Sequence, residues 1–234
     1  MRDVIRNWNY DFISGACNFI FENYYDVEIE GLENIINDKK GGIIVSNHDT
    51  PQEDWIYKKD KEGKIILHTH SVDQLLIAAY LNSDQKFHAI VSKAHYKNRL
   101  RKGLLEALQQ IPASKYGIID PSRNYLEKNE YVLIFPEGNS GQKSKLVDSV
   151  GTKIYPGLGR LVSNLDNPQI FPVNIRINGK KDNLWPKFES AKIKFGKPFY
   201  YLDEFGEFPV EKNEMIDSFK ISKDIMDKKV YPLG

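Results

Sequence analysis

The chain has 234 residues, which suits one α/β domain with a substantial core and is cramped for two full domains. Its 33 basic and 32 acidic residues give a formal net charge of +1, so composition provides no argument for a nucleic-acid partner or for strong overall attraction to anionic lipid. The single cysteine, Cys17, excludes an intrachain disulfide, and we expect it to be a buried small residue in a reducing compartment.

Neither a membrane-spanning helix nor a secretory signal is predicted. No run of the sequence approaches the roughly 18 apolar residues that a spanning helix needs. The first residues, MRDVIRNWNYDFISGACNF, place charged and amide groups where a signal peptide needs a continuous apolar stretch.

The sequence begins with a predicted amphipathic helix over residues 3–24, because apolar side chains recur there at spacings of three and four. This face consists of Val4, Ile5, Trp8, Phe12, Ile13, Ala16, Phe19, Ile20 and Tyr24. Such a helix can lie in the plane of a membrane surface or pack on its own domain. Both interpretations stay open, since the polar face carries few basic residues.

Strand-like and helical segments then alternate. VEIEGL, GGIIVSN, KIILHTH, HAIVS, YVLIF, QIFPVNIRI and AKIKFGKPFYY are predicted strands, the last broken at Gly196 and Pro198 as edge strands often are. SVDQLLIAAYL, RLRKGLLEALQQI, GLGRLVSNL and residues 210–229 are predicted helices, and ENIINDKK is a predicted polar turn. This alternation predicts a single α/β domain with a mixed, mostly parallel sheet flanked by helices.

Polar residues that follow strands are the first candidates for a site, because ligands of open α/β sheets gather at strand ends. His48 ends the strand-like run GGIIVSN, and Asp73 opens a helix further along. An imidazole can accept a proton from an alcohol near neutral pH, and a carboxylate on its other nitrogen orients it. No protein nucleophile accompanies the pair, so the substrate's own hydroxyl would attack, as in direct acyl transfer.

A second candidate is the strand-to-turn segment Phe135, Pro136, Glu137, Gly138, Asn139, Ser140 and Gly141. Backbone N–H groups of such a turn can bind an anion, and a phosphate would fit. An ordinary tight turn explains the same residues. A third candidate is the strand-like IPAS followed by Lys115, which could hold a phosphate or be a surface lysine.

Taken together, these segments resemble the glycerolipid acyltransferases, the PlsC-like family of lysophosphatidic acid and glycerol-3-phosphate acyltransferases. GGIIVSNH is similar to the Asn-His opening of the family's His-x4-Asp motif, QQIPASK to its second block, and YVLIFPEGNSG to its Phe-Pro-Glu-Gly-Thr-Arg-Ser block. QIFPVNI and KIKFGKPF resemble its later strands, so the similarity extends in order over about residues 27–225. We therefore divide the chain into the N-terminal amphipathic helix, over residues 1–26, and an acyltransferase domain, implied by the resemblance, over residues 27–234.

The chain departs from the family pattern around the catalytic motif. An insertion of about twenty residues between the motif's two halves would pair His48 with Asp73. The chief alternative pair is His68 with Asp73, which have the family spacing, and the next is His48 with Asp54. Lys115, Asn139 and Ser140 stand where the family has arginine, threonine and arginine, so an acceptor other than the usual one is also compatible with the sequence.

The resemblance implies transfer of a fatty acyl group from an acyl thioester to the hydroxyl of a lysophospholipid or glycerol phosphate, in phospholipid biosynthesis. His48 would be the general base and Asp73 would orient it, with oxyanion stabilisation from backbone donors near Gly138. Lys115 and residues 135–140 would bind substrate. The reaction needs no metal or other cofactor; the donor is acyl-coenzyme A or acyl carrier protein. We expect a cytoplasmic enzyme, peripheral on the cytoplasmic face of a membrane.

Two other functions explain parts of the sequence. LHTHS resembles the opening of metal-dependent phosphoesterases, with His68 and His70 as ligands, although only His88 and His95 follow as further histidines. A noncatalytic lipid-binding relative would explain the insertion and the missing arginines. Retention of both Asn-His and Phe-Pro-Glu-Gly argues against it, because folding needs neither.

Overall fold

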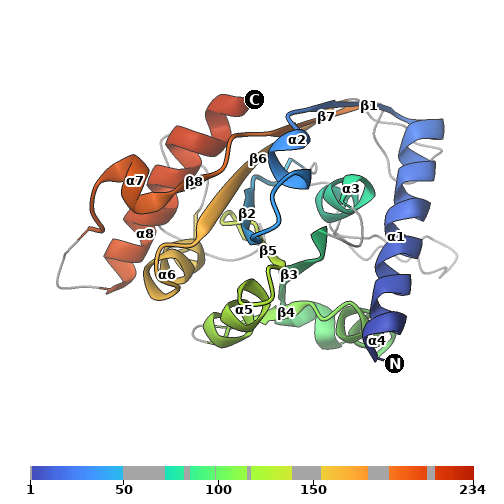
Figure 1. The fold of residues 1–234 in the computed structure, drawn as a ribbon, viewed down its shortest axis with the longest axis horizontal. Helices are drawn as coiled ribbons and strands as arrows, with labels where there is room; N and C mark the ends of the chain where they lie inside the picture. Colours follow the sequence, from blue (N-terminus) through green and yellow to red (C-terminus); the bar gives the residue numbers. More distant parts are fainter. Residues whose placement is uncertain are drawn as a thin grey trace, which may run out of the picture.

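The computed structural model describes residues 2–49, 72–81, 85–97, 99–114, 117–138, 154–178, 190–209 and 214–234. Within these residues one sheet has the strand order β1-β7-β6-β2-β5-β3-β4, with β8 paired to β6 (Figure 1). The strands are β1 (Asp26–Glu30), β2 (Gly42–Ser46), β3 (Phe87–Ser92), β4 (Ile111–Ala113), β5 (Tyr131–Ile134), β6 (Gln169–Asn178), β7 (Ser190–Phe195) and β8 (Phe199–Tyr200).

Helices connect and cover the strands. The α-helices are α1 (Arg2–Tyr24), α2 (Glu33–Ile36), α3 (Val72–Tyr80), α4 (Arg99–Ala107), α5 (Ile119–Leu126), α6 (Gly157–Asn164), α7 (Tyr201–Phe205) and α8 (Glu214–Ile225). Shorter elements are the 3-10 helix η3 (Lys93–Lys97), the π-helix η4 (Met226–Val230) and the 3-10 helix η5 (Tyr231–Leu233). Among the described residues, none of these helices combines the length and apolar character needed to cross a membrane.

The sheet is mostly parallel, which confirms the predicted fold class. β2 pairs in parallel with both β5 and β6, β3 with β4 and β5, and β1 with β7. Only β6 with β7 and β6 with β8 are antiparallel among the described pairs. β2 therefore lies in the middle of the sheet, where both of its edges are hydrogen-bonded.

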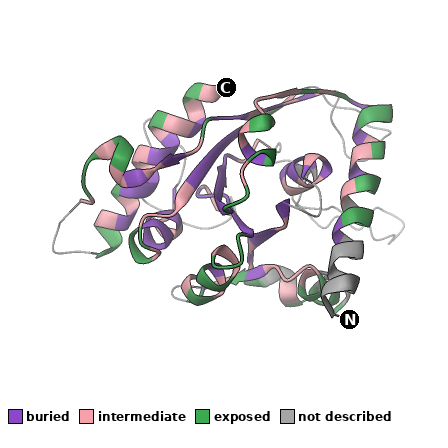
Figure 2. Cartoon of the chain, viewed as in Figure 1, coloured by how far each residue is buried: buried purple, intermediate pink, exposed green. Residues whose placement is uncertain are grey.

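Alternate residues of the central strands enter two separate cores. Ile44 of β2 packs in a core with residues of α1, α2 and α3, whereas Ile43 and Val45 pack in a core with residues of α6, α8 and η4. Successive side chains of a strand point to opposite faces, so both faces of β2 must be apolar. Figure 2 shows the central strands buried between these helical layers.

The N-terminal helix was predicted correctly, but its buried face was not. Tyr10, Cys17 and Phe21 of α1 are buried, as is Tyr25 directly after it, and none of these four belongs to the predicted apolar face. Burial raises the pKa of the Cys17 thiol to about 11, as expected for a small residue in the core. The predicted face includes Phe12, Phe19 and Tyr24, which are exposed.

Three further differences from the sequence predictions have local causes. The predicted turn ENIINDKK contains α2, because Ile35 is fully buried in the core. β7 is not an edge strand, since it lies between β1 and β6; the chain breaks at Gly196 where the side chains of Pro172 and Leu233 approach it. α5 was not predicted; Pro121 lies in its first turn, where proline is tolerated.

Candidate active site

The site lies at the carboxyl end of β2. Every residue of this strand, from Gly42 to Ser46, is buried, and the strand continues directly into Asn47 and His48. β2 pairs with β5 as far as Val45 and with β6 as far as Ser46. The strand end is thus fixed on both sides, which gives His48 a defined position.

Asn47 continues the contact with β6 through its side chain. Its Nδ2 donates to the carbonyl of Ile175 at 2.9 Å, and its Oδ1 accepts from the Ile175 N–H at 2.8 Å. This residue is buried, so the two bonds satisfy polar groups that have no access to water. The sequence resemblance included Asn47 but assigned it no function; no spacing pattern reveals that it bonds to β6.

His48 and Asp73, which are 25 residues apart, are brought together by the fold. His48 Nδ1 lies 2.8 Å from Asp73 Oδ2, in the first turn of α3. The His48 side chain is 21% exposed, whereas that of Asp73 is 2% exposed. Because the carboxylate accepts, Nδ1 is the donor, and in the neutral imidazole Nε2 then carries the lone pair. This geometry suits a general base whose carboxylate partner is shielded from water.

Phe135 fixes the plane of the imidazole. The rings of His48 and Phe135 stack with centroids 4.2 Å apart and an interplanar angle of 16°. Phe135 follows β5, the strand beside β2, and is itself buried. Three constraints therefore orient His48: its strand, the Asp73 carboxylate and this aromatic ring.

Asp49 adds a second carboxylate near the pair, which the sequence analysis missed. Its Oδ2 accepts from the Ile177 N–H at 2.5 Å. Burial, more than any other cause, raises the pKa of Asp49; the negative charge of Asp73 raises it further, while the Ile177 hydrogen bond and Arg176 lower it. Its place directly after His48 was the only signal available in the sequence.

The turn after β5 contacts the site through Glu137. Its Oε2 accepts from the backbone N–H of His48 at 2.8 Å. Gly138 adopts φ +63°, and a Cβ added there would lie 2.6 Å from the ring of Tyr155. The Gly138 N–H donates to the carbonyl of Phe135 at 3.0 Å, so the turn already uses this predicted oxyanion donor.

Several predicted site residues lie outside the described residues. These are Lys115, Asn139 and Ser140 of the expected phosphate site, and His68 and Asp54 of the alternative catalytic pairs. His70 of the alternative metal site lies outside as well. In the part of the chain that the structure describes, no group of three or more His, Cys, Asp or Glu side chains could hold a metal ion.

His88 is described and lies away from this site in the core. Its Nδ1 contacts the carbonyl of Gln109 at 3.0 Å, and its Nε2 contacts Glu130 Oε2 at 2.9 Å. The ring also stacks on Tyr125, with centroids 3.5 Å apart. Both ring nitrogens are used inside the protein, so His88 is a structural residue and not a metal ligand.

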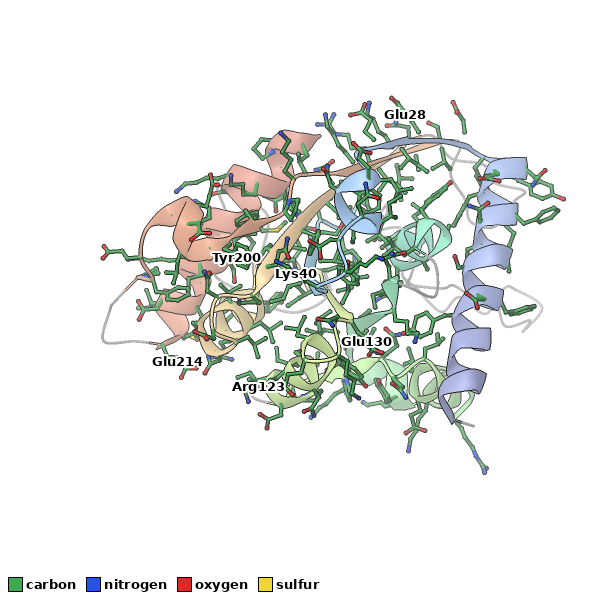
Figure 3. All side chains as sticks on the ribbon, in the orientation of Figure 1. Glu28, Lys40, Arg123, Glu130, Tyr200 and Glu214 are labelled. Carbon is green, nitrogen blue, oxygen red and sulfur yellow. The ribbon has the colours of Figure 1, made fainter. Side chains whose placement is uncertain are left out.

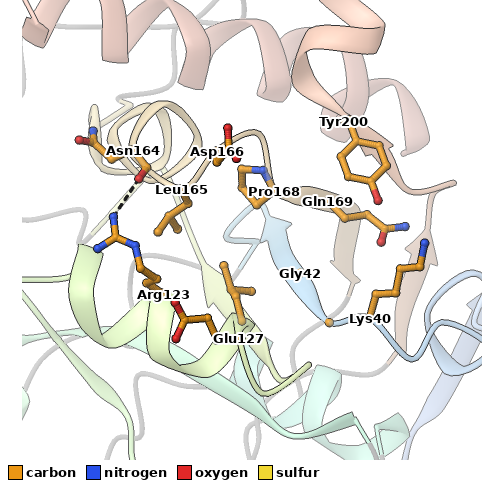
Figure 4. Close-up of a pocket in the computed structure, with 12 residues that line it drawn as sticks. Lys40, Gly42, Arg123, Glu127, Asn164, Leu165, Asp166, Pro168, Gln169 and Tyr200 are labelled. Atoms are coloured by element: carbon orange, nitrogen blue, oxygen red, sulfur yellow. Dashed lines mark hydrogen bonds between the residues drawn. The ribbon is translucent and has the colours of Figure 1, made fainter.

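A pocket of about 450 Å³ lies at the opposite edge of the sheet, where β2 and β6 begin (Figure 4). Its walls include Arg123, which donates to the carbonyl of Asn164 at 3.1 Å, and Gln169, which donates to Asp38 at 3.0 Å. These polar groups make hydrogen bonds within the protein, and the length of β2 separates the pocket from His48.

Comparisons with known proteins agree with the sequence motifs. Residues 63–176 match the family model described as Acyltransferase. The fold is similar to the crystal structure of the 1-acyl-sn-glycerophosphate (LPA) acyltransferase PlsC from Thermotoga maritima, with a TM-score of 0.56 and 15% sequence identity over 95% of this chain and 80% of that chain. No curated protein matches. The family match agrees with the sequence resemblance, and the structural match shows the same fold. The matched range includes His68 and Asp73 but not His48.

Proposed function

We propose that this chain transfers a fatty acyl group from an acyl thioester to the hydroxyl of a lysophospholipid or glycerol phosphate. Its match to the Acyltransferase family and its PlsC-like fold are the premises of this proposal. The single observation that carries the catalytic part of this proposal is the 2.8 Å contact between His48 Nδ1 and Asp73 Oδ2. It gives a base, its orienting carboxylate and a partly exposed ring at one strand end.

The reaction uses the neutral form of His48 as the base. Nε2 accepts the proton of the acceptor hydroxyl as its oxygen attacks the thioester carbonyl carbon. The new ester C–O bond forms, the C–S bond breaks, and the imidazolium returns its proton to the departing thiolate. Asp73 stabilises the imidazolium during this cycle; such general-base help typically contributes about 10² to 10⁴ in rate.

His48 is preferred to His68 on structural grounds. β2 delivers His48 from the centre of the sheet to Asp73, and Phe135 and Glu137 of the neighbouring turn contact it. These are the residues that the family resemblance assigned to the site. Since the family match begins at residue 63, His68 remains the natural rival and must be tested beside His48.

The substrate classes rest on the family resemblance. Lys115, Asn139 and Ser140, together with the turn at residues 135–138, would bind the acceptor phosphate. Acyl-coenzyme A and acyl carrier protein are both compatible donors. The reaction as written uses no metal or redox cofactor.

Association with a membrane surface is supported by α1. Phe12 and Phe19 are 67% and 61% exposed and lie seven residues apart, which places them on one side of the helix. Aromatic side chains on one face can enter the boundary between headgroups and acyl chains. We propose that α1 lies on the cytoplasmic face of a membrane, where lipid substrates reside.

The test is release of free thiol from long-chain acyl-coenzyme A, with lysophosphatidate or glycerol-3-phosphate as the acceptor. Wild type should release thiol only when an acceptor is present. We expect His48→Ala to lower the rate by about 10² or more, and His68→Ala to retain most of it.

Other outcomes would redirect the proposal. Loss of activity with His68→Ala alone would assign the base to His68. No release by wild type, with acyl-coenzyme A and with acylated carrier protein, would favour a noncatalytic lipid-binding protein. Asp73→Asn should be about as harmful as loss of the base, because it removes the charge that stabilises the imidazolium.

A further inference from the structure

The C-terminal segment reaches the site along an irregular helix. α8 passes into the π-helix η4 and then into η5, which begins at Tyr231. Single π-turns within helices occur often at functional sites, because they shift the side chains that follow. The carbonyl of Val230 accepts from Asn174 Nδ2 at 3.2 Å, which attaches this segment to β6.

Tyr231 contacts the same carboxylate that holds His48. Its hydroxyl donates to Glu137 Oε1 at 3.0 Å, while Glu137 Oε2 accepts from the His48 N–H at 2.8 Å. One oxygen of the Glu137 carboxylate is thus bound by the C-terminal segment, and the other is bound by the backbone just after β2. Two anchor points define one side-chain conformation, and hydrogen bonds to an ionised group are stronger than neutral ones.

We propose that Tyr231 is a positioning residue for His48 and acts through Glu137. β2 ends at Ser46, so the Glu137 carboxylate serves as an acceptor for the His48 N–H beyond the end of the strand. Without the Tyr231 hydroxyl, the Glu137 carboxylate loses one of its anchors and its support of the His48 backbone weakens. The imidazole must stay within hydrogen-bond reach of Asp73 and stacked on Phe135 to act as a base.

This inference rests on the proposed function for its kinetic effect and on the structure for its geometric effect. Tyr231→Phe keeps the ring and removes only the hydroxyl. We expect kcat for thiol release to fall about tenfold with KM for both substrates nearly unchanged, because the hydroxyl supports the base and not substrate binding.

Tyr201→Phe is the matched control. The Tyr201 hydroxyl also donates to a carboxylate, Asp224 Oδ2 at 3.3 Å, within the same C-terminal layer. It has no contact with His48 or Glu137 among those that the structure describes. We expect kcat to be unchanged, even if the thermal midpoint falls slightly.

The amide resonance of His48 in a ¹H–¹⁵N NMR spectrum gives a readout that needs no activity. A bond to a carboxylate shifts an amide proton downfield; this shift should decrease in Tyr231→Phe and persist in Tyr201→Phe. If wild type shows no turnover but the resonance responds in this way, the positioning stands and the proposed function fails. An unchanged resonance, or equal kcat losses in both variants, overturns the positioning.

Discussion

At the scale of single residues, the site depends on side chains that replace backbone contacts. Asn47 bonds to both polar groups of Ile175, and Glu137 accepts the N–H of His48. Both act just beyond the last paired residue of β2. The carboxyl end of β2 is therefore held by side chains, whereas the rest of the strand is held by its backbone hydrogen bonds.

Replacing Asn47 should harm stability and activity together. Asn47→Ala leaves the buried N–H and carbonyl of Ile175 without these partners, and we expect the free energy of unfolding to fall by about 2 kcal/mol. kcat should fall as well, because His48 is the next residue. Urea denaturation and thiol release measure the two effects.

A control for this variant is Asn47→Asp, which keeps an acceptor for the Ile175 N–H but loses the donor to its carbonyl. It also buries a charge, so we expect it to be no more stable than the alanine variant. If Asn47→Ala is as stable as wild type, the two hydrogen bonds between Asn47 and Ile175 of β6 do not contribute to stability.

At the scale of elements, β1 is joined to β7 by charges as well as by its backbone. In the parallel register Glu28 lies opposite Lys192 and Glu30 opposite Lys194. Glu30 contacts Lys192 at 2.5 Å and Lys194 at 3.0 Å, and Glu28 contacts Lys192 at 2.9 Å. Glu28 is labelled at this edge of the sheet in Figure 3.

The contacts of Glu30 with Lys192 and Lys194 predict a loss of stability in acid. Hydrogen bonds from Lys192 and Lys194 lower the pKa of Glu30 to about 2. A lowered carboxyl pKa stabilises the folded state above the ordinary value of about 4.3, and this contribution is lost as pH falls toward 2. Glu30→Gln should therefore be less stable at pH 7 and should lose less stability between pH 4.5 and 2.

Urea midpoints at several pH values test this expectation, with Asp26→Asn as the control. Asp26 lies on the same strand but opposite Ser190, so the register gives it no lysine partner across the strands. High salt should reduce the difference between Glu30→Gln and wild type, because these charges are exposed. If the urea midpoints of Glu30→Gln and wild type fall in parallel as the pH is lowered, the proposed role of Glu30 is contradicted.

At the scale of the whole molecule, α1 is part of the core and also exposes apolar side chains. The hydroxyl of Tyr10 donates to the carbonyls of Phe87 and Leu108, and Phe21 is almost completely buried. Deleting residues 1–25 would thus open the core as well as remove any membrane contact. Substitution of exposed residues is the cleaner test of membrane binding.

The double variant Phe12→Ser, Phe19→Ser should bind vesicles roughly tenfold more weakly than wild type, because two aromatic side chains no longer enter the lipid boundary. Its circular dichroism should be unchanged. Sedimentation with vesicles containing anionic lipid measures the binding. The matched control is Met215→Ser, Ile216→Ser, which removes exposed apolar side chains from α8 on the other side of the molecule (Figure 1). Equal binding by both variants and wild type would exclude α1 as the contact.

The sequence by itself determined many of the elements and the fold class, although not α2 or α5. Buried strands such as GIIVS are apolar on both faces, and helices such as SVDQLLIAAYL show their caps and period, because these signals are local. The order of the motifs also indicated the family resemblance, with which the Acyltransferase match over residues 63–176 agrees. It proposed His48 with Asp73 while leaving His68 and Asp54 as alternatives.

Only the tertiary structure decided what depends on contacts between distant segments. It brought Asp73 to His48, buried the unassigned face of α1, placed β7 inside the sheet and carried Tyr231 to Glu137. The physical reason is that spacing along the chain encodes helix and strand periods. Which residues contact a strand end or a helix face depends instead on the packing of the whole chain.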